Sequence, residues 1–195
     1  MKRFISIITL LALLLPLSAT ASTWTLDPDH STVQFKVRHL MISNVKGVFE
    51  KVSGTLNLDE KDITKSKVDV TIDTASVDTN IKKRDDHLRS ADFFDAAKFP
   101  TMTFTSTKVE KVGADQLKVF GNLSIKGITR PVILEVENLS PEIKDPRGKE
   151  RRGASATTSI NRKDFGVNWS ATMDNGGMVV AEDVAIQLEV EFIKK

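Results

Sequence analysis

The sequence predicts an all-β fold of antiparallel strands around one apolar interior. Apolar and polar residues alternate with a period of two along most of the chain, and turn signals rich in Gly and Asp separate the alternating runs. No rhythm of strand, helix and strand is visible. Strict alternation gives each strand one dry and one wet face, which is typical of antiparallel sheets. We therefore expect about eight or nine strands, arranged as a sandwich or as a closed barrel.

The expected strands can be placed in chain order from their alternating apolar positions. They lie at residues 33–37, 48–58, 68–72, 102–104, 117–125, 132–136, 154–160 and 184–192. Turn signals at 112–115 and 126–127 separate neighbouring runs. Residues 142–152 are rich in Lys, Arg and Gly, and we expect them to form a solvated hairpin loop.

Two short helical segments are expected to interrupt the sheet. Residues 81–90 are the stronger candidate, because Asn80 can cap the start of a helix there. Ile81 and Leu88 are seven residues apart and fall on one side of that helix. Residues 39–44 have room for a single helical turn.

A break in the alternation favours a barrel over a sandwich. Val48, Val52 and Leu56 share one face of their run, whereas Phe49 falls on the other face. A β-bulge between Gly47 and Gly54 would return Phe49 to the interior and curve the strand, as barrels require.

The first residues have the pattern of an export signal. Lys2 and Arg3 precede an apolar run at 5–15, which Pro16 ends, and small residues follow at 19–21. The apolar run is too short to cross roughly 30 Å of hydrocarbon comfortably. We expect cleavage near Ala21, a single domain over residues 22–195, and a periplasmic location without stable membrane insertion.

Charge and cysteine content exclude several classes of function. Lys2 and Arg3 account for the whole net charge of +2, so residues 22–195 are expected to be neutral. A basic field for nucleic acid is therefore absent, and no nucleic-acid partner is expected. The chain has no cysteine, which rules out a thiol nucleophile, a thiolate metal site and a lipid-modified cysteine.

The sequence offers no established catalytic or metal-binding pattern. Its three histidines are His30, His39 and His87, and their spacing matches no metal motif. A Gly-x-Ser-x-Gly nucleophile turn and a Gly-rich phosphate loop are both absent. We predict no catalytic residue, no metal and no cofactor, other than an isoprenoid quinone bound as a ligand.

The segment at 84–94, RDDHLRSADFF, is the richest local pattern. One interpretation is a lid over a barrel mouth, where Arg84, His87 or Arg89 meets a polar ligand head. The other is a surface helix with internal salt bridges, followed by a Phe plug into the core. Arg162 is a further candidate for the head, although an ion pair with Asp164 that pins a turn would explain it equally.

These clusters resemble the signature of the YceI-like family of polyisoprenoid-binding proteins. The matching segments, in order, are DHSTVQF at 29–35, RDDHLRSADF at 84–93, FTS at 104–106, GNL at 121–123, GITRPV at 127–132 and INRKDFG at 160–166. The resemblance spans essentially all of residues 22–195. It implies a lipocalin-like antiparallel barrel of about eight strands that takes up a long isoprenoid chain, such as a quinone or a prenyl phosphate. It transfers no catalytic residue.

The expected ligand contacts combine the predicted inner faces with the aromatic clusters. Ala154, Ala156 and Thr158 put small groups on one inner face, which leaves volume for a slender ligand. The apolar candidates are Phe35, Val37, Phe49, Val70, Ile72, Phe94, Met102, Phe104, Val119, Leu134, Phe165, Trp169, Ile186 and Leu188. The candidates for the polar head are Arg84, His87, Arg89 and Arg162.

Two other functions stay open at this point. The first alternative is an enzyme that acts on an isoprenoid lipid, with His87 or Asp85 as acid–base. The second is a stress-related interaction protein with a filled core. A continuous apolar tunnel would favour lipid binding over a filled interaction module. The sequence leaves a homodimer open as well, because a neutral chain lacks one barrier to self-association.

Overall fold

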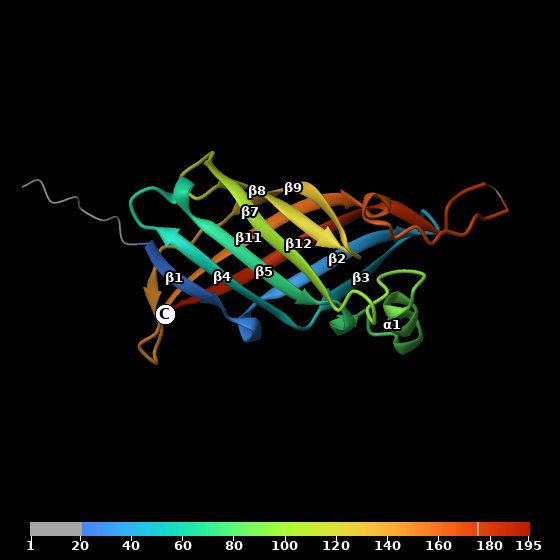
Figure 1. The fold of residues 1–195 in the computed structure, drawn as a ribbon, viewed down its shortest axis with the longest axis horizontal. Helices are drawn as coiled ribbons and strands as arrows, with labels where there is room; N and C mark the ends of the chain where they lie inside the picture. The colour runs from blue at the N-terminus through green and yellow to red at the C-terminus, as the bar shows by residue number, and fades with distance from the viewer. Residues whose placement is uncertain (1–20, 175) are drawn as a thin grey trace, which may run out of the picture.

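A computed structural model describes residues 21–174 and 176–195, and it shows one antiparallel sheet wrapped into a barrel (Figure 1). The export signal predicted for residues 1–21 lies outside the described residues, except for Ala21. The strands are β1 (Ala21–Leu26), β2 (Thr32–His39), β3 (Ser43–Phe49), β4 (Val52–Asp59), β5 (Lys67–Asp73), β6 (Val77–Asp78), β7 (Thr101–Lys111), β8 (Leu117–Ile125), β9 (Ile128–Glu137), β10 (Ile143–Lys144), β11 (Glu150–Asn161) and β12 (Val180–Lys194). The helices are α1 (Lys82–Arg89) and four short 3₁₀ turns, η1 (Pro28–His30), η2 (Ile63–Lys65), η3 (Thr74–Ser76) and η4 (Arg162–Phe165).

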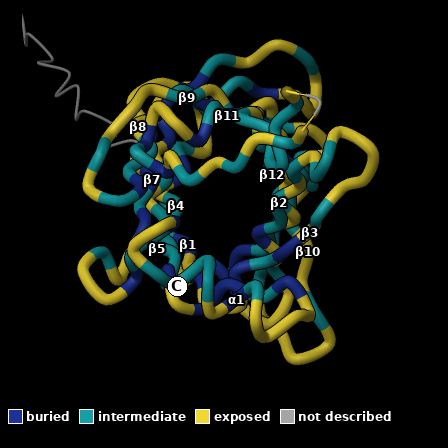
Figure 2. Tube along the Cα trace, turned by 90° about the vertical axis from the view of Figure 1, so that its right-hand side faces the viewer, coloured by how far each residue is buried: buried dark blue, intermediate teal, exposed yellow. Residues whose placement is uncertain are grey.

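Eight of the strands form a closed ring. Their order is β11, β9, β8, β7, β5, β4, β1 and β12, and β12 pairs back with β11. That closing ladder runs from Arg151 opposite Ile193 to Asn161 opposite Asp183. Figure 2 looks along the barrel and shows the strands arranged around its axis. The all-β, antiparallel barrel predicted from the sequence is therefore confirmed.

On its other edge, the long strand β12 pairs with two strands, β1 and β2. β1 pairs with its last residues, Phe192–Lys194, whereas β2 pairs with the stretch from Val180 to Glu189. β3 and β6 continue the sheet beyond β2. Beside the first part of β12 the barrel wall is therefore formed by β2 and β3, and beside its last residues it is formed by β1.

The predicted bulge between Gly47 and Gly54 is wrong. The chain instead turns a corner between β3 and β4, which pair with different neighbours. Phe49 ends β3 and Val52 begins β4, and both side chains are buried. The end of one strand and the start of the next therefore bring Phe49 to the interior, and its predicted interior position is correct.

The helix predictions are correct for α1 only, and its capping differs. Ile81 occupies the N-cap position and makes no side-chain capping bond. Asn80 has a φ of 61° and lies before the cap, so its predicted capping role is wrong. Residues 39–44 form the turn between β2 and β3, in which Leu40 and Met41 have φ of 50° and 60°. The single helical turn expected there is absent.

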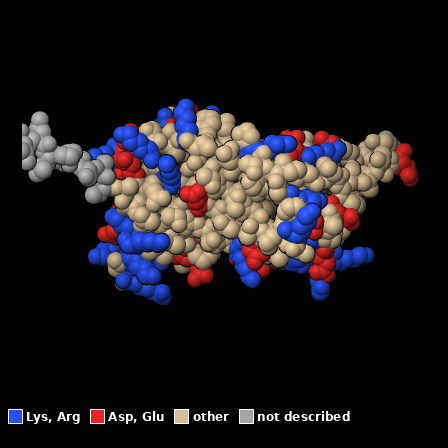
Figure 3. All heavy atoms as spheres, in the orientation of Figure 1, with Lys and Arg blue, Asp and Glu red and all other residues tan. Residues whose placement is uncertain are grey.

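The predicted solvated hairpin loop at 142–152 is correct only for its tip. β10 pairs with the start of β11, so the segment is a short two-stranded hairpin. Arg151 in this hairpin has a largely buried side chain, held by three carboxylates. On the face drawn in Figure 3, Lys and Arg gather around this end of the barrel, and uncharged side chains cover most of the middle.

Trp24 marks the end of the barrel opposite α1. Its side chain has no exposed surface, and its indole Nε1 donates to Ser22 Oγ at 2.7 Å. The cationic groups of Arg152 and Lys194 lie over the ring, 5.6 and 5.4 Å from its centroid. Within the described ranges, no helix is long and apolar enough to cross a membrane.

Candidate ligand cavity

The barrel encloses a cavity of about 470 Å³. This volume lies in the range of about 300–1,000 Å³ that is usual for ligand pockets. Every apolar residue predicted to contact a ligand lies in its wall, namely Phe35, Val37, Phe49, Val70, Ile72, Phe94, Met102, Phe104, Val119, Leu134, Phe165, Trp169, Ile186 and Leu188. Whether these residues touch a ligand stays a prediction.

Small side chains on β11 keep part of the interior empty. Ala154, Ala156 and Thr158 alternate along the strand and line the cavity, as their shared parity predicts. On the facing wall, Phe35 packs its ring over Gly47, where an added Cβ would lie 2.7 Å from Phe35 Cε1. The glycine lets this ring approach the strand closely, and Phe35 also lines the cavity.

An aromatic cluster stands at the α1 end of the cavity. The rings of His87, Phe93 and Trp169 contact one another, with centroid separations of 4.9, 5.4 and 5.2 Å. His87 Nε2 lies 2.9 Å from Asp92 Oδ2. Phe94 packs edge-on against Phe49 at 5.7 Å. All except Asp92 line the cavity.

The segment at 84–94 fits the interpretation as a helix followed by phenylalanines in the core, and it also borders the cavity; contact with a ligand head stays a prediction. It is a helix with internal ion pairs, Lys82–Asp86 at 2.6 Å and Arg89–Asp86 at 3.2 Å. It is followed by buried or half-buried phenylalanines that also form part of the cavity wall.

Arg84 and Asp85 meet at a buried threonine. Arg84 Nε donates to Thr79 Oγ1 at 2.7 Å, and Thr79 Oγ1 donates to Asp85 Oδ1 at 2.5 Å. The backbone N–H of Thr79 donates to the same carboxylate oxygen at 2.9 Å. Arg84 lines the cavity, whereas Asp85 is not in its wall. The hydrogen bonds of Asp85 hold α1 against Thr79, just after β6. The Asp85 carboxylate is therefore not placed to act as an acid or base on a ligand in the cavity.

The structure does not place Arg89 in the cavity wall, which disfavours the head contact suggested for it. Its Nε donates to the Ala75 carbonyl at 2.7 Å and its Nη2 to the Val77 carbonyl at 2.6 Å. The side chain therefore holds α1 against the segment around β6.

Arg162 is buried and lines the cavity. It donates to three backbone carbonyls, those of Val167 at 2.6 Å, Ala181 at 2.9 Å and Val180 at 3.4 Å. The suggested ion pair with Asp164 is absent, since Asp164 is exposed. Among the residues that the structure describes, no carboxylate lies within ion-pair distance of Arg162. Burial lowers the pKa of Arg162 from its ordinary value, because the charged form is desolvated.

Sequence reasoning missed three polar residues of the cavity wall, Gln34, His39 and Arg152. Arg152 shares the parity of Ala154 and Ala156, so alternation extended by one step would have found it. Its Nη2 lies 3.6 Å from Glu60 Oε2. Its buried Nε has no hydrogen-bond partner and lies near the Trp24 ring. His39 shares the parity of Val33 and Phe35 in β2, so the same extension by one step would have found it too.

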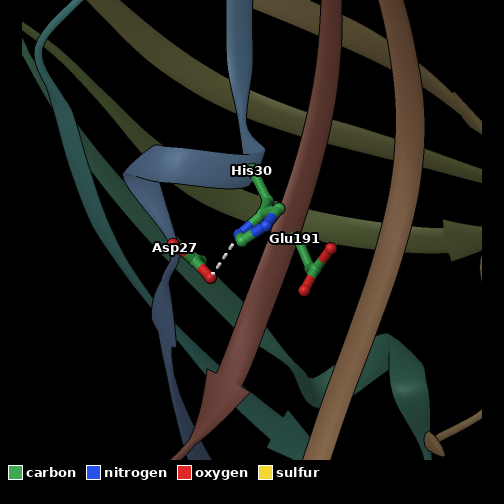
Figure 4. Close-up of side chains that lie close together, drawn as sticks. All are labelled: Asp27, His30 and Glu191. Carbon is green, nitrogen blue, oxygen red and sulfur yellow. Dashed lines mark hydrogen bonds and ion pairs between the residues drawn. The ribbon is translucent and has the colours of Figure 1, made fainter. Parts of the chain in front are cut away.

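A second cluster, Asp27, His30 and Glu191, has the spacing of a metal site (Figure 4). His30 Nδ1 lies 2.9 Å from Asp27 Oδ2. Arg151 Nη1 donates to the same Asp27 oxygen at 2.6 Å and also to Glu191. The hydrogen bond from Arg151 holds the pKa of the Asp27 carboxyl below its ordinary value. Because Arg151 already forms ion pairs with both carboxylates, we interpret the cluster as an ion-pair clasp that joins the β10–β11 hairpin to the start of η1.

The fold and the cavity define a class of protein: a closed antiparallel β-barrel with an apolar interior and a short helix at one end. A protein-family model described as the YceI-like domain matches residues 24–192. The chain therefore belongs to the YceI-like family, as the sequence motifs indicated.

Individual relatives agree with this assignment. The chain is similar to protein YceI of Salmonella newport, 42% identical over 180 residues, which cover 91% of this chain and 90% of that protein. The crystal structure of BcnA of Burkholderia cenocepacia has a TM-score of 0.74 and 25% identity, covering 85% of this chain and 98% of that one. A polyisoprenoid binding domain from Saccharophagus degradans has the same fold, with a TM-score of 0.64, 18% identity, and coverage of 90% and 100%.

Proposed function

We propose that this protein binds and carries a long-chain isoprenoid lipid, of the quinone or prenyl phosphate type, in the periplasm after export. The observation that carries the proposal is the cavity of about 470 Å³, whose wall is almost wholly apolar. The barrel encloses this cavity, whereas a filled core would have favoured the interaction module. The polyisoprenoid binding domain from Saccharophagus degradans supports the proposal at the level of the fold.

The apolar wall supplies the affinity for the tail. Burying one CH₂ group contributes about 0.8 kcal/mol, so a five-carbon isoprene unit contributes roughly 3–4 kcal/mol before the cost of ordering the chain. A few units therefore offset the entropy lost on binding with few polar contacts. This arrangement suits a carrier, because binding the tail requires no reactive group in the wall.

The structure offers little support for an enzyme. Of the two acid–base candidates, Asp85 is engaged by Thr79 outside the cavity wall. His87 does line the cavity, but its ring is packed against Phe93 and Trp169. We therefore favour binding without turnover.

Native mass spectrometry of the protein tests the proposal. The full chain is expressed with its own leader, the periplasmic and cytoplasmic fractions are separated, and the protein of each is sprayed intact. We expect the periplasmic protein to lack the leader and to carry the mass of an isoprenoid lipid. Consistently empty protein that also takes up no added prenyl ligand would refute lipid binding, and full-length protein confined to the cytoplasm would refute export.

A pair of variants on β11 provides the control. Ala156 is buried in the cavity wall, and its neighbour Thr157 is exposed on the outer face. Ala156→Phe places a ring in the cavity and should abolish lipid retention, whereas Thr157→Phe adds the same ring outside and should retain the lipid. Equal loss in both variants would show that the lipid is not held where we place it.

A further inference from the structure

The cavity wall contains one buried positive charge, on Arg162, that forms no ion pair with a described carboxylate. The charge of Glu182 acts on it only from beyond ion-pair distance. A guanidinium has five N–H donors. Arg162 directs three of them to the carbonyls of Val167, Val180 and Ala181. The other two have no acceptor among the described residues. Arg162 is only 5% exposed, so bulk water satisfies them poorly.

The other arginines of the wall differ from Arg162. Arg152 lies 3.6 Å from Glu60 and 3.9 Å from Glu142, and it stacks over Trp24. Arg84 is half-buried and shares the Thr79 hydroxyl with the Asp85 carboxylate. Within the described part of the chain, only Arg162 combines burial, a place in the wall and the lack of a carboxylate within ion-pair distance.

Such a charge is expensive unless something compensates it. Burying an ionised group costs far more than burying a neutral polar group, and carbonyl dipoles offset only part of that cost. A neutral acceptor, such as a quinone oxygen, would satisfy an N–H but leave the charge. An anion would satisfy both the free donors and the charge, and charge-assisted hydrogen bonds are about twice as strong as neutral ones.

We propose that Arg162 binds an anionic headgroup, a phosphate or a carboxylate, of the lipid in the cavity. This inference rests on the proposed function and selects among its ligands in favour of an acidic one. It also orients the ligand. Arg162 follows the α1 end of β11, and Arg152 lies at the Trp24 end of the same strand. The tail therefore extends from Arg162 along Ala154 and Ala156 toward Trp24.

Pairs of probes with the same tail and different heads test this proposal. Delipidated protein is titrated with farnesyl phosphate and with farnesol, and binding is followed by tryptophan fluorescence and calorimetry. Hexadecanoate and hexadecanol form a second pair, which distinguishes a carboxylate from a phosphate as the preferred anion. We expect the wild type to prefer the anion of at least one pair by about 10- to 100-fold, the range for hydrogen bonds to a charged group.

Substitutions locate the origin of that preference. Arg162→Gln should reduce it to within about threefold, and Arg162→Lys should give an intermediate value, because a lysine keeps the charge but loses the fork of donors. Arg89→Gln is the matched control, since Arg89 also donates to backbone carbonyls near α1 but lies outside the cavity wall. It should leave the preference unchanged.

The outcomes separate the two proposals. If neither member of either pair binds, the proposed lipid-binding function fails. If alcohols bind as tightly as anions in the wild type, or if folded Arg162→Gln keeps the preference, the function stands and the role of Arg162 is refuted. If Arg162→Gln does not fold, Arg162→Lys decides: a preference lowered at least about threefold supports the role, and an unchanged preference overturns it.

Discussion

Gly47→Ala should destabilise the barrel through a specific clash with Phe35. An added Cβ would lie 2.7 Å from Phe35 Cε1 and 2.7 Å from Thr79 Cγ2, closer than real Cβ atoms approach. Thr79 is held by its bonds to Arg84 and Asp85, so it yields little. The Phe35 ring borders the cavity and must move into it. Overpacking of this kind typically costs about 1–3 kcal/mol.

The assay is a double-mutant cycle by urea denaturation of the lipid-free protein. Phe35→Leu removes the ring atoms that the new methyl group would meet. The two substitutions together should therefore be less destabilising than the sum of the single effects, with a coupling of about 0.5–3 kcal/mol, the range for residues in contact. Additive effects would refute the packing argument. Lipid retention provides a second readout, because a ring pushed into the cavity should reduce it in Gly47→Ala but not in the double variant.

Two further predictions concern acid stability and the aromatic cluster. Hydrogen bonds from Arg151 hold the pKa values of Asp27 and Asp145 below the ordinary 3.8. Their stabilisation is thus complete above about pH 5 and is lost as the pH falls toward the lowered native values, because the unfolded chain then binds more protons. Urea unfolding between pH 2 and pH 6 should show this fall, and Arg151→Met should flatten it; an equally steep fall in the variant would exclude the clasp as its source. His87→Ala should change the fluorescence of Trp169, which its ring contacts at 5.4 Å between centroids, while lipid retention persists. Loss of a lipid turnover activity in that variant would instead revive the enzyme hypothesis.

The sequence predicted the barrel and its inner faces because both follow from a local pattern. Alternation with period two identifies which side chains share a face, and closure of the sheet turns that face into a wall. This is why Phe35, Val119 and Ile186, far apart in the chain, line one cavity. The family motifs added the choice of a barrel over a sandwich, which periodicity alone left open.

The errors occurred where partners distant in sequence decide the outcome. A change of parity at Phe49 has the same appearance whether a strand bulges or ends, and only the pairing of β3 with β2 and of β4 with β1 distinguishes the two. Proximity in sequence favours an ion pair between Arg162 and Asp164, yet the hydrogen bonds of Arg162 go partly to carbonyls of residues 180 and 181. Alternation of apolar residues does not predict Arg152 as part of the cavity wall, because a charged residue ends an apolar run.

The arrangement of β12 sets an order of events during biogenesis. It follows every other described strand in the chain, yet it bridges β11 on one edge to β1 and β2 on the other. Until β12 has emerged, no strand joins β1 and β2 to β11, and the ring stays open. Contacts between segments so distant in sequence form late and slowly. A chain threaded across a membrane from its N-terminus would therefore cross before its barrel exists, and it would acquire its lipid only on the far side.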